Sequence, residues 1–238
     1  MANEKLVIGE SSVTASQMQD FFRQMKDGSI TGGMVQNFLE RKNPFEEILD
    51  NPAVSQKVLR DWERFYKKHF NLAVDLSRVI IPKMPKEEGM WRLLFIAEGL
   101  TNNKVFDACK RKFPCYKYTE DLDARVPKND RDPKNGTYAI WVRNTVEADE
   151  IYKSKSANNL ANENIKGITL LERDVYELKY FIETGEHLDI NRWTFCLGSR
   201  DSDGHLPIVR WCGGEFEMSW HNAGHSDHVL RSREVIFS

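Results

Sequence analysis

The chain has 238 residues, enough for one large domain or two modest ones. Hydrophobic residues make up 40% of it and aromatic residues 11%, which is typical of a folded core and excludes a wholly disordered chain. The formal net charge of −2 argues against a general nucleic-acid binder, because such proteins carry a clear basic excess.

The N-terminal sequence and the cysteines bear on the compartment. Residues 1–10 are polar, and no stretch of the chain approaches the roughly 20 apolar residues that span a bilayer. We therefore expect a soluble, cytoplasmic protein without a membrane partner. Its thiols are then expected to be reduced and to serve mainly as buried structural groups. The four cysteines are Cys109, Cys115, Cys196 and Cys212.

Residues 1–70 predict a small helical unit. Residues 14–17 fit a capping box, and the apolar residues that follow share one helical face up to Gly28. A second helix is expected to begin after Thr31, and a third to carry Trp62 on its apolar side. The link between the second and third helices is long, acidic and broken by prolines, which does not fit the tight turn of a DNA-binding helix-turn-helix.

Residues 71–238 predict a mixed domain, so the chain as a whole is expected to be an α+β protein. Val79–Ile81 and Trp91–Ala97 are strand-like. Thr101 can cap a helix that ends in the basic run 110–112, which suits the negative end of the helix dipole.

The densest basic cluster of the chain lies on and beside that helix. Aromatic residues interleave with it, and basic residues beside aromatic rings can hold a nucleic-acid strand. A solvated helix end above a packed aromatic side is the simpler structural interpretation. The cluster consists of Lys104, Lys110, Arg111, Lys112 and Lys117.

Residues 168–184 predict the strongest helix. Its apolar stripe is Leu171, Val175, Leu178 and Ile182, and Gly185 follows at the position of a C-cap glycine. We expect this helix to be the central packing element of the second domain, lying against the sheet that contains the tryptophans. The opposite face is charged and is expected to meet water; it carries Glu172, Arg173, Glu177 and Lys179.

The last part of the chain predicts short strands joined by Gly and Asp turns. Gly213–Gly214 between two alternating runs indicates a hairpin. The long helix is expected to pack on one small, mostly antiparallel sheet. The expected strands are Tyr138–Arg143, Thr194–Leu197, Ile208–Cys212, Glu215–Trp220 and Leu230–Phe237.

Three constellations could carry chemistry, and each has a plainer structural interpretation. His221, His225 and His228 could hold zinc, but the glycine and asparagine among them indicate a loop rather than a fixed scaffold. Residues 201–204 begin like a calcium loop, but Cys212 stands where an EF-hand needs Glu, so a turn is the better interpretation. A cysteine nucleophile lacks any local base or oxyanion hole.

Two resemblances extend this picture. The runs T-Y-A-I-W-V-R, G-I-T-L-L-E-R, E-L-K-Y-F, G-S-R-D-S-D-G and L-R-S-R are similar to those of a family of uncharacterised proteins from uncultured environmental bacteria. This resemblance covers most of the chain and implies a bacterial protein, without a function. Residues from about 136 to 238 resemble the C-type-lectin-like fold of sulfatase-modifying and related binding domains.

The second resemblance rests on three segments: Ile168–Arg173 at the opening of the helix, Gly198–Arg200 at a serine segment, and Leu230–Val235 at the end. The chain departs from that pattern, because no proline opens the helix and the final arginines are shifted. The resemblance implies a binding module rather than an enzyme, since the copper-binding cysteines of the catalytic relatives have no matching motif here.

The leading hypothesis is a non-enzymatic binding or interaction protein without a cofactor, since loops on a rigid scaffold commonly carry binding. The favoured partner is a protein or a small-molecule ligand. The candidate binding residues are Arg200, Asp201, Asp203, Arg210, Trp211, Trp220 and His221. One alternative is a nucleic-acid-associated protein that uses the basic cluster. The other is a metal-dependent hydrolase that uses the three C-terminal histidines.

Overall fold

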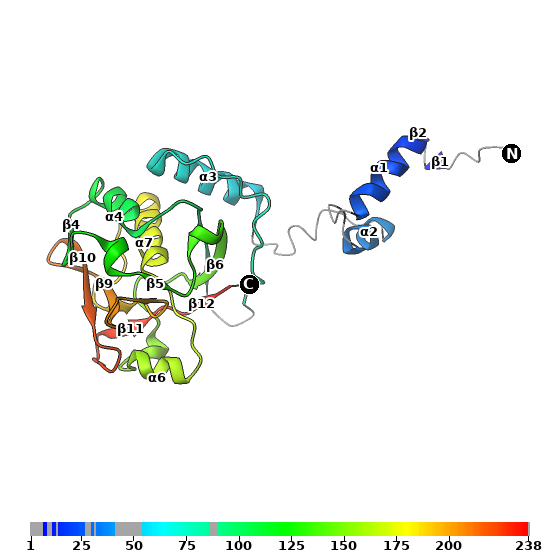
Figure 1. Cartoon of the computed structure of the whole chain (residues 1–238). Helices are drawn as coiled ribbons and strands as arrows, with labels where there is room; N and C mark the ends of the chain where they lie inside the picture. Colours follow the sequence, from blue (N-terminus) through cyan, green and yellow to red (C-terminus); the bar gives the residue numbers. More distant parts are fainter. Residues whose placement is uncertain are drawn as a thin grey trace. The chain divides into compact units, whose positions relative to one another are not determined.

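The chain folds into two compact units, residues 1–55 and 56–238 (Figure 1). The boundary lies before the third predicted helix, whereas the sequence had suggested residue 70. The computed structural model describes residues 7–8, 11–12, 14–26, 30, 32–40, 54–85 and 90–237. Among these, no helix has the length and apolar content needed to cross a membrane.

The first unit holds short elements. These are β1 (Val7–Ile8) and β2 (Ser11–Ser12), which pair antiparallel, and the helices α1 (Ala15–Lys26) and α2 (Gly32–Leu39). The predicted capping box is confirmed at the start of α1, where the Gln17 N–H donates to Thr14 Oγ1 at 3.2 Å. Gly28 and Thr31, the predicted end of α1 and cap of α2, lie outside the described residues.

The helix α3 (Gln56–Phe70) opens the second unit because its aromatic residues are buried in that unit. Trp62, Phe65 and Tyr66 are all less than 5% exposed. The Tyr66 hydroxyl donates a hydrogen bond to the carbonyl of Phe95, far along the chain. Burial of this aromatic stripe is therefore what assigns α3 to the second unit.

The second unit is an α+β fold with two main sheets rather than the single sheet expected. An antiparallel sheet has the order β12–β6–β3, and a five-stranded sheet has the order β11–β7–β9–β10–β4. The larger sheet is antiparallel in the middle and parallel at both edges, between β11 and β7 and between β10 and β4. The predicted strand 138–143 therefore belongs to a different sheet from the C-terminal hairpin.

The strands of the smaller sheet are β3 (Trp91–Ile96), β6 (Tyr138–Arg143) and β12 (Val235–Ile236). Those of the larger sheet are β4 (Cys115–Lys117), β7 (Trp193–Phe195), β9 (Leu206–Cys212), β10 (Glu215–His221) and β11 (Leu230–Ser232). A separate short pair joins β5 (Lys128–Asn129) to β8 (Ser199–Arg200). The predicted strand 79–81 is not a strand; it is irregular chain, and the Trp141 indole N–H donates to the adjacent Pro82 carbonyl at 2.8 Å.

The other helices of the second unit are α4 (Asn102–Lys110), α5 (Leu122–Arg125), α6 (Ala157–Asn162) and α7 (Leu170–Thr184), with single 3₁₀ turns η2 (Pro133–Asn135) and η3 (Glu150–Tyr152). The cap predicted at Thr101 is confirmed, because its hydroxyl accepts the Lys104 N–H. The Gly213–Gly214 hairpin between β9 and β10 is confirmed as well. Both glycines have positive φ, as such a turn requires.

α7 is the central packing element, as expected, since it contacts α4, β3 of the smaller sheet and β9 of the larger one (Figure 1). Thr169 and Glu172 form a capping box at its start, and Gly185 ends it with φ 76°. Leu178 is fully buried, whereas Ile182 at the end of the predicted stripe is 36% exposed.

The charged face of α7 does not meet water, which corrects the prediction for Glu172, Arg173, Glu177 and Lys179. The first three are fully buried, and Lys179 is 3% exposed. Each is buried beside charged side chains from other segments of the chain. For example, Arg131, from the loop before η2, forms an ion pair with Glu172 at 2.6 Å. The helical period locates a charged face, but it cannot tell whether partners from elsewhere will cover that face.

Candidate functional site

The five-stranded sheet has two unlike faces, and the pairing register assigns each side chain to one of them. Phe216 is fully buried on the face that meets α7, where the Arg173 guanidinium lies over its ring at 5.6 Å. On the opposite face, Arg210 of β9 lies directly across from Glu217 of β10. α6 covers one end of that second face through Leu160, and the remainder is open enough to leave Arg210 and Glu217 partly exposed.

Aromatic rings and one ion pair follow one another over this open part of the sheet, and we call the set the ring strip. Tyr116 sits in β4 beside Glu217, and Tyr118 follows it on the same side. The two tyrosines are 48% and 61% exposed, respectively. The strip consists of Tyr116, Tyr118, Glu217, Arg210, Trp193, His221 and His225.

Neighbouring members of the ring strip lie close to one another, and the Tyr118 hydroxyl forms a hydrogen bond with Glu217. The Tyr116 and Tyr118 rings meet edge to face at 4.8 Å. The Arg210 guanidinium binds Glu217 at 2.8 Å and lies 4.1 Å from the centre of the Trp193 ring.

The histidines extend this run beyond Trp193. The Trp193 and His221 rings are nearly parallel, at 14°, with centroids 6.3 Å apart. The His221 and His225 rings stack at 4.5 Å. Neighbouring strands, with the residue after β4 and the loop after β10, therefore present a row of flat surfaces.

The electrostatics of the ring strip are close to neutral. The charge of Glu217 raises the pKa of the Tyr118 hydroxyl, so the phenol stays protonated. Burial lowers the pKa of His221, and the nearby His225 and Arg210 lower it further, so this imidazole is uncharged at neutral pH. Arg210 and Glu217 offset each other, which leaves polar hydrogen-bonding groups without a large net field.

Two of the seven predicted binding residues, Arg210 and His221, lie in the ring strip. Trp211 and Trp220 are partly buried and belong to the opposite face of the sheet. Trp211 stacks on His187 with ring centroids 3.4 Å apart, and the Arg125 guanidinium lies over Trp220 at 5.3 Å. Both tryptophans therefore have packing roles.

The predicted residues of the 200s loop hold a turn together. Asp201 is fully buried and accepts the backbone N–H groups of Asp203 and His205 at 2.9 and 2.8 Å. Arg125 binds the second oxygen of Asp201 at 2.7 Å. Arg200 donates to the carbonyls of Leu197 and Ser199. These bonds support the turn interpretation of this segment.

Potential metal ligands meet at one place within the described part of the chain. That group is Asp201, Asp203 and His205, whose ligand atoms lie within 4.8 Å of one another. Arg125 already supplies positive charge there. His221, His225 and His228 do not form such a group; His228 turns to Asp227 at 2.9 Å and is 77% exposed.

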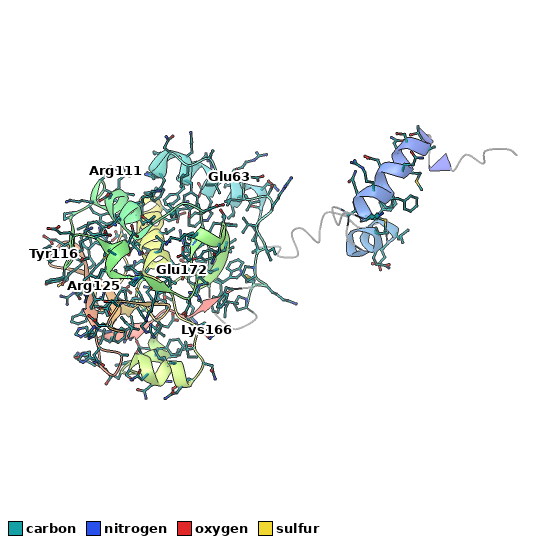
Figure 2. All side chains as sticks on the ribbon, in the orientation of Figure 1. Glu63, Arg111, Tyr116, Arg125, Lys166 and Glu172 are labelled. Atoms are coloured by element: carbon teal, nitrogen blue, oxygen red, sulfur yellow. The ribbon has the colours of Figure 1, made fainter. Side chains whose placement is uncertain are left out.

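The basic cluster is divided by the fold. Lys110, Arg111 and Lys112 are exposed at the end of α4, and Figure 2 shows Arg111 close to α3. Lys104 donates to the Gly99 carbonyl at 2.7 Å. Lys117 is held inward, where it donates to Asn103 and to the Glu120 carbonyl.

α3 adds basic residues that the sequence did not associate with this cluster. Lys67 and Lys68 are exposed in its last turn, and a hollow of about 410 Å³ is lined by Lys68, Lys104, Arg111 and Asp107, among others. We call the exposed set Lys67, Lys68, Lys104, Lys110, Arg111 and Lys112 the basic patch. The pKa of His69 is lowered to about 4. Burial is the largest cause, and the positive charges of Lys112, Lys68 and Arg111 add to it.

Burial raises the pKa of three of the four cysteine thiols. Cys109 and Cys196 are fully buried, which raises the pKa of each thiol well above its ordinary value. Burial raises the pKa of Cys115 to about 12. Cys212 is exposed beside the hairpin turn. All four are free thiols.

Sequence reasoning missed Tyr116, Tyr118 and Trp193 as members of one site. They come from β4 and β7, and only the pairing of these strands around β9 and β10 brings them together. Figure 2 shows Tyr116 at the margin of the second unit. No protein-family model matches the chain, and no curated protein or solved structure matches it either.

Proposed function

We propose that this protein is a non-enzymatic binding module and that the ring strip is its contact surface. One observation carries the proposal: flat rings and one ion pair form a row along the open face of a five-stranded sheet and the start of the loop after β10. A sheet holds such groups at fixed spacing, so little conformational entropy is lost when a ligand lies across them. The resemblance of residues 136–238 to C-type-lectin-like binding domains points the same way.

The chemistry of the ring strip favours a saccharide chain as its ligand. Sugar rings offer flat apolar faces that pack on aromatic rings, and hydroxyl groups that bond to charged side chains. Arg210 can donate to a hydroxyl oxygen and Glu217 can accept from a hydroxyl hydrogen, while their opposite charges leave no strong preference for a charged ligand. A single-stranded nucleic acid would instead require a positively charged groove beside the rings.

The proposal is tested by titrating the full chain with a panel of neutral hexasaccharides (β-1,4-linked glucose, xylose, mannose and N-acetylglucosamine) in a calorimeter. The double variant Tyr116→Ala/Tyr118→Ala should lower the affinity for any member that binds by about tenfold, because each aromatic contact contributes about 0.5–1.5 kcal/mol. Met90→Ala is the matched control, since Met90 is 73% exposed on the other sheet.

Two outcomes would count against the proposal. One is that no saccharide of the panel binds at millimolar concentration. The other is that the double variant binds as well as the wild type while both are folded. Because the two tyrosines are among the more exposed residues of the unit, their removal should leave the melting temperature unchanged.

A second candidate function, association with nucleic acid, is favoured by the convergence of α3 and α4 on the basic patch. Six cationic side chains gather there, and their charges add to the effect of burial in lowering the pKa of His69. Bound phosphates would offset that field, so a single-stranded oligonucleotide should raise the pKa of His69 toward its ordinary value. NMR titration of the His69 ring with and without a 20-nucleotide strand measures this.

Affinity in a salt series is the companion measurement for the basic patch. Real phosphate contacts make binding fall steeply as salt rises. Lys68→Ala and Lys112→Ala should each weaken binding and flatten the salt slope. Lys134→Ala, a lysine 81% exposed outside the patch, should do neither. Absence of binding at low salt would end this candidate.

A further inference from the structure

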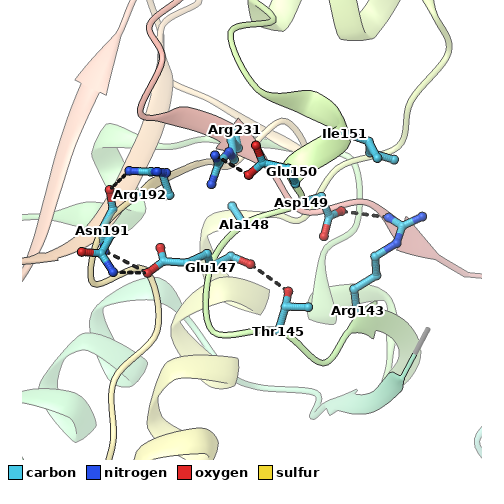
Figure 3. A pocket seen from close by; sticks show the side chains of 10 residues that line it. All are labelled: Arg143, Thr145, Glu147, Ala148, Asp149, Glu150, Ile151, Asn191, Arg192 and Arg231. Atoms are coloured by element: carbon cyan, nitrogen blue, oxygen red, sulfur yellow. Dashed lines mark hydrogen bonds and ion pairs between the residues drawn. The ribbon is translucent and has the colours of Figure 1, made fainter.

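A pocket of about 570 Å³ lies beside β11 and η3 and shares no residue with the ring strip (Figure 3). Its lining is unusually rich in charge for its size. It includes three arginines, three carboxylates and an asparagine: Arg143, Arg192, Arg231, Glu147, Asp149, Glu150 and Asn191. The volume is in the range of pockets that hold small molecules.

Arg231 is the unusual residue in this pocket. Its side chain is 3% exposed, yet its guanidinium pairs with Glu150, whose side chain is 70% exposed. Its Nε, also buried, has no hydrogen-bond partner among the described residues. A buried charge normally requires partners that are themselves held in place, because desolvation is otherwise not offset.

The neighbouring buried arginine differs in its partners, although its Nε likewise has no hydrogen-bond partner among the described residues. Arg233, two residues along the chain, binds Asp189 at 2.7 Å, and Asp189 is fully buried. Arg233 also donates to the carbonyls of Thr145 and Val146. Arg231 has no such fixed partners. Its guanidinium pairs with the carboxylate of Glu150, an exposed side chain that can rotate into solvent.

Two carboxylates in the pocket have spare acceptor oxygens. Glu147 Oε1 accepts two hydrogen bonds from Asn191 at 3.0 Å, but its buried Oε2 has no partner among the described residues. Asp149 binds Arg143 through one oxygen at 3.0 Å, while its other oxygen is buried and has no hydrogen-bond partner among the described residues. The pocket lining therefore holds a cation that can receive an anionic group, together with two carboxylates whose unpaired oxygens are buried and must rotate toward the pocket to accept N–H or O–H donors.

We infer that this pocket binds a small organic acid that also carries ammonium or hydroxyl groups, such as an amino acid or a hydroxy acid. The carboxylate of the ligand pairs with the Arg231 guanidinium and displaces the carboxylate of Glu150. Its donor groups turn to Glu147 and Asp149. Arg192, partly exposed at the rim, adds a second positive charge near the entrance.

The side chain of Glu150 thus acts as an internal competitor for Arg231. The test is ligand-detected NMR of the full chain with the twenty amino acids and with lactate, malate, tartrate and citrate. The amides of the hydroxy acids serve as uncharged counterparts, and inorganic phosphate shows whether any anion suffices. Acids should bind and their amides should not.

Two variants in the pocket and one matched control outside it decide the assignment. Glu150→Gln should raise the affinity of each acid that binds by about 1.5- to 5-fold, because it removes the exposed carboxylate that competes with the ligand for Arg231. Glu163→Gln, at a glutamate 45% exposed and paired with Lys155 outside the pocket, should leave the affinity unchanged. Arg231→Gln should lower it by at least about 30-fold, since it removes the buried partner.

Equal affinity of the wild type and Glu150→Gln, or binding that survives Arg231→Gln, would overturn the inference. Failure of the whole panel to bind would do the same. Arg231→Gln can also destabilise the fold; in that event the affinities of Glu150→Gln and Glu163→Gln, both changed at exposed positions, still distinguish competition by Glu150 from its absence.

Discussion

The guanidinium of Arg173 and the carboxylate of Asp189 lie 2.9 Å apart with both side chains fully buried. Asp189 also binds Arg233 at 2.7 Å and accepts the Thr194 hydroxyl at 2.5 Å. One carboxylate thus joins α7, β7 and the end of β11. This junction connects the long helix to the sheet whose other face carries the ring strip.

Removing the charge of Asp189 should destabilise the second unit strongly. Asp189→Asn keeps the shape and tolerates the positive φ of 55°, but it leaves the buried Arg233 guanidinium without its anion and Arg173 with Glu177 alone. We expect a loss of about 3–5 kcal/mol in the free energy of unfolding, measured by urea denaturation at pH 7. Glu163→Gln, which breaks the exposed pair with Lys155, should cost less than about 1 kcal/mol.

The pH dependence of this junction follows from the same contacts. Burial pushes the pKa of Asp189 upward, but Arg233 and Arg173 outweigh it and hold the pKa below its ordinary value. A group with a depressed pKa stabilises the fold above its unfolded pKa and loses that effect as the pH falls through its folded pKa. The wild type should therefore lose stability below about pH 4, and Asp189→Asn should lose less.

Asp174 should behave in the opposite way. It is fully buried on α7, and neither carboxyl oxygen has a hydrogen-bond partner among the described residues. Burial raises its pKa well above the ordinary value, a direction that Arg173 opposes without reversing. The protonated form is then the stable one in the fold, and stability falls as the pH rises from the unfolded pKa toward the folded one.

Asp174→Asn should remove that pH-dependent loss and make the protein more stable than the wild type at pH 7. Thermal unfolding at pH 5 and pH 8 measures it, and the gain over the wild type should be larger at pH 8. A variant less stable than the wild type at both values would mean that the Asp174 carboxyl is ionised and satisfied in the fold.

Leu178→Ala should cost about 2–5 kcal/mol, because Leu178 is fully buried in the middle of α7 and its truncation leaves a cavity. Ile182→Ala is a matched control on the same helix, where the side chain is 36% exposed and should cost clearly less. Thermal unfolding of both variants decides the point. Equal costs would contradict the place of α7 between the sheets.

Local features of the fold could be predicted where the residues that cause them are adjacent in the sequence. The cap at Thr101, the αL glycine at Gly185 and the Gly213–Gly214 hairpin each depend on a few adjacent residues, and all three are confirmed. The strand expected at residues 79–81 failed for the converse reason. Its apolar residues are strand-like, but no neighbouring strand is available to pair with it among the described residues.

The charged face of α7 and the division into two sheets could not be predicted, because both depend on distant partners. Asp189 pairs with the buried Arg173 from outside the helix, and Arg131 does the same for Glu172. A charged side chain in a helical pattern looks the same whether or not such partners exist. Burial of charge is a property of the assembled fold.

The candidate site divides in the same way. Arg210 and His221 could be singled out from one alternating strand, but the strand period alone did not separate them from Trp211 and Trp220 on the other face. Trp193, Tyr116 and Tyr118 lie beside Arg210 and His221 only because β7 and β4 flank β9 and β10 in the sheet. The pocket around Arg231 was missed because Glu150 and Arg231 are far apart in the sequence.

The place of ligand contact is the most direct test of the proposed function. We suggest NMR of the full chain, labelled at the tryptophan indoles and histidine rings, titrated with the hexasaccharide that binds best in the calorimetric panel. The account predicts that the signals of Trp193 and His221 shift while those of Trp62 and Trp141, which lie in the core, stay in place. Shifts confined to residues outside the ring strip, with Trp193 and His221 unchanged at saturation, would contradict it.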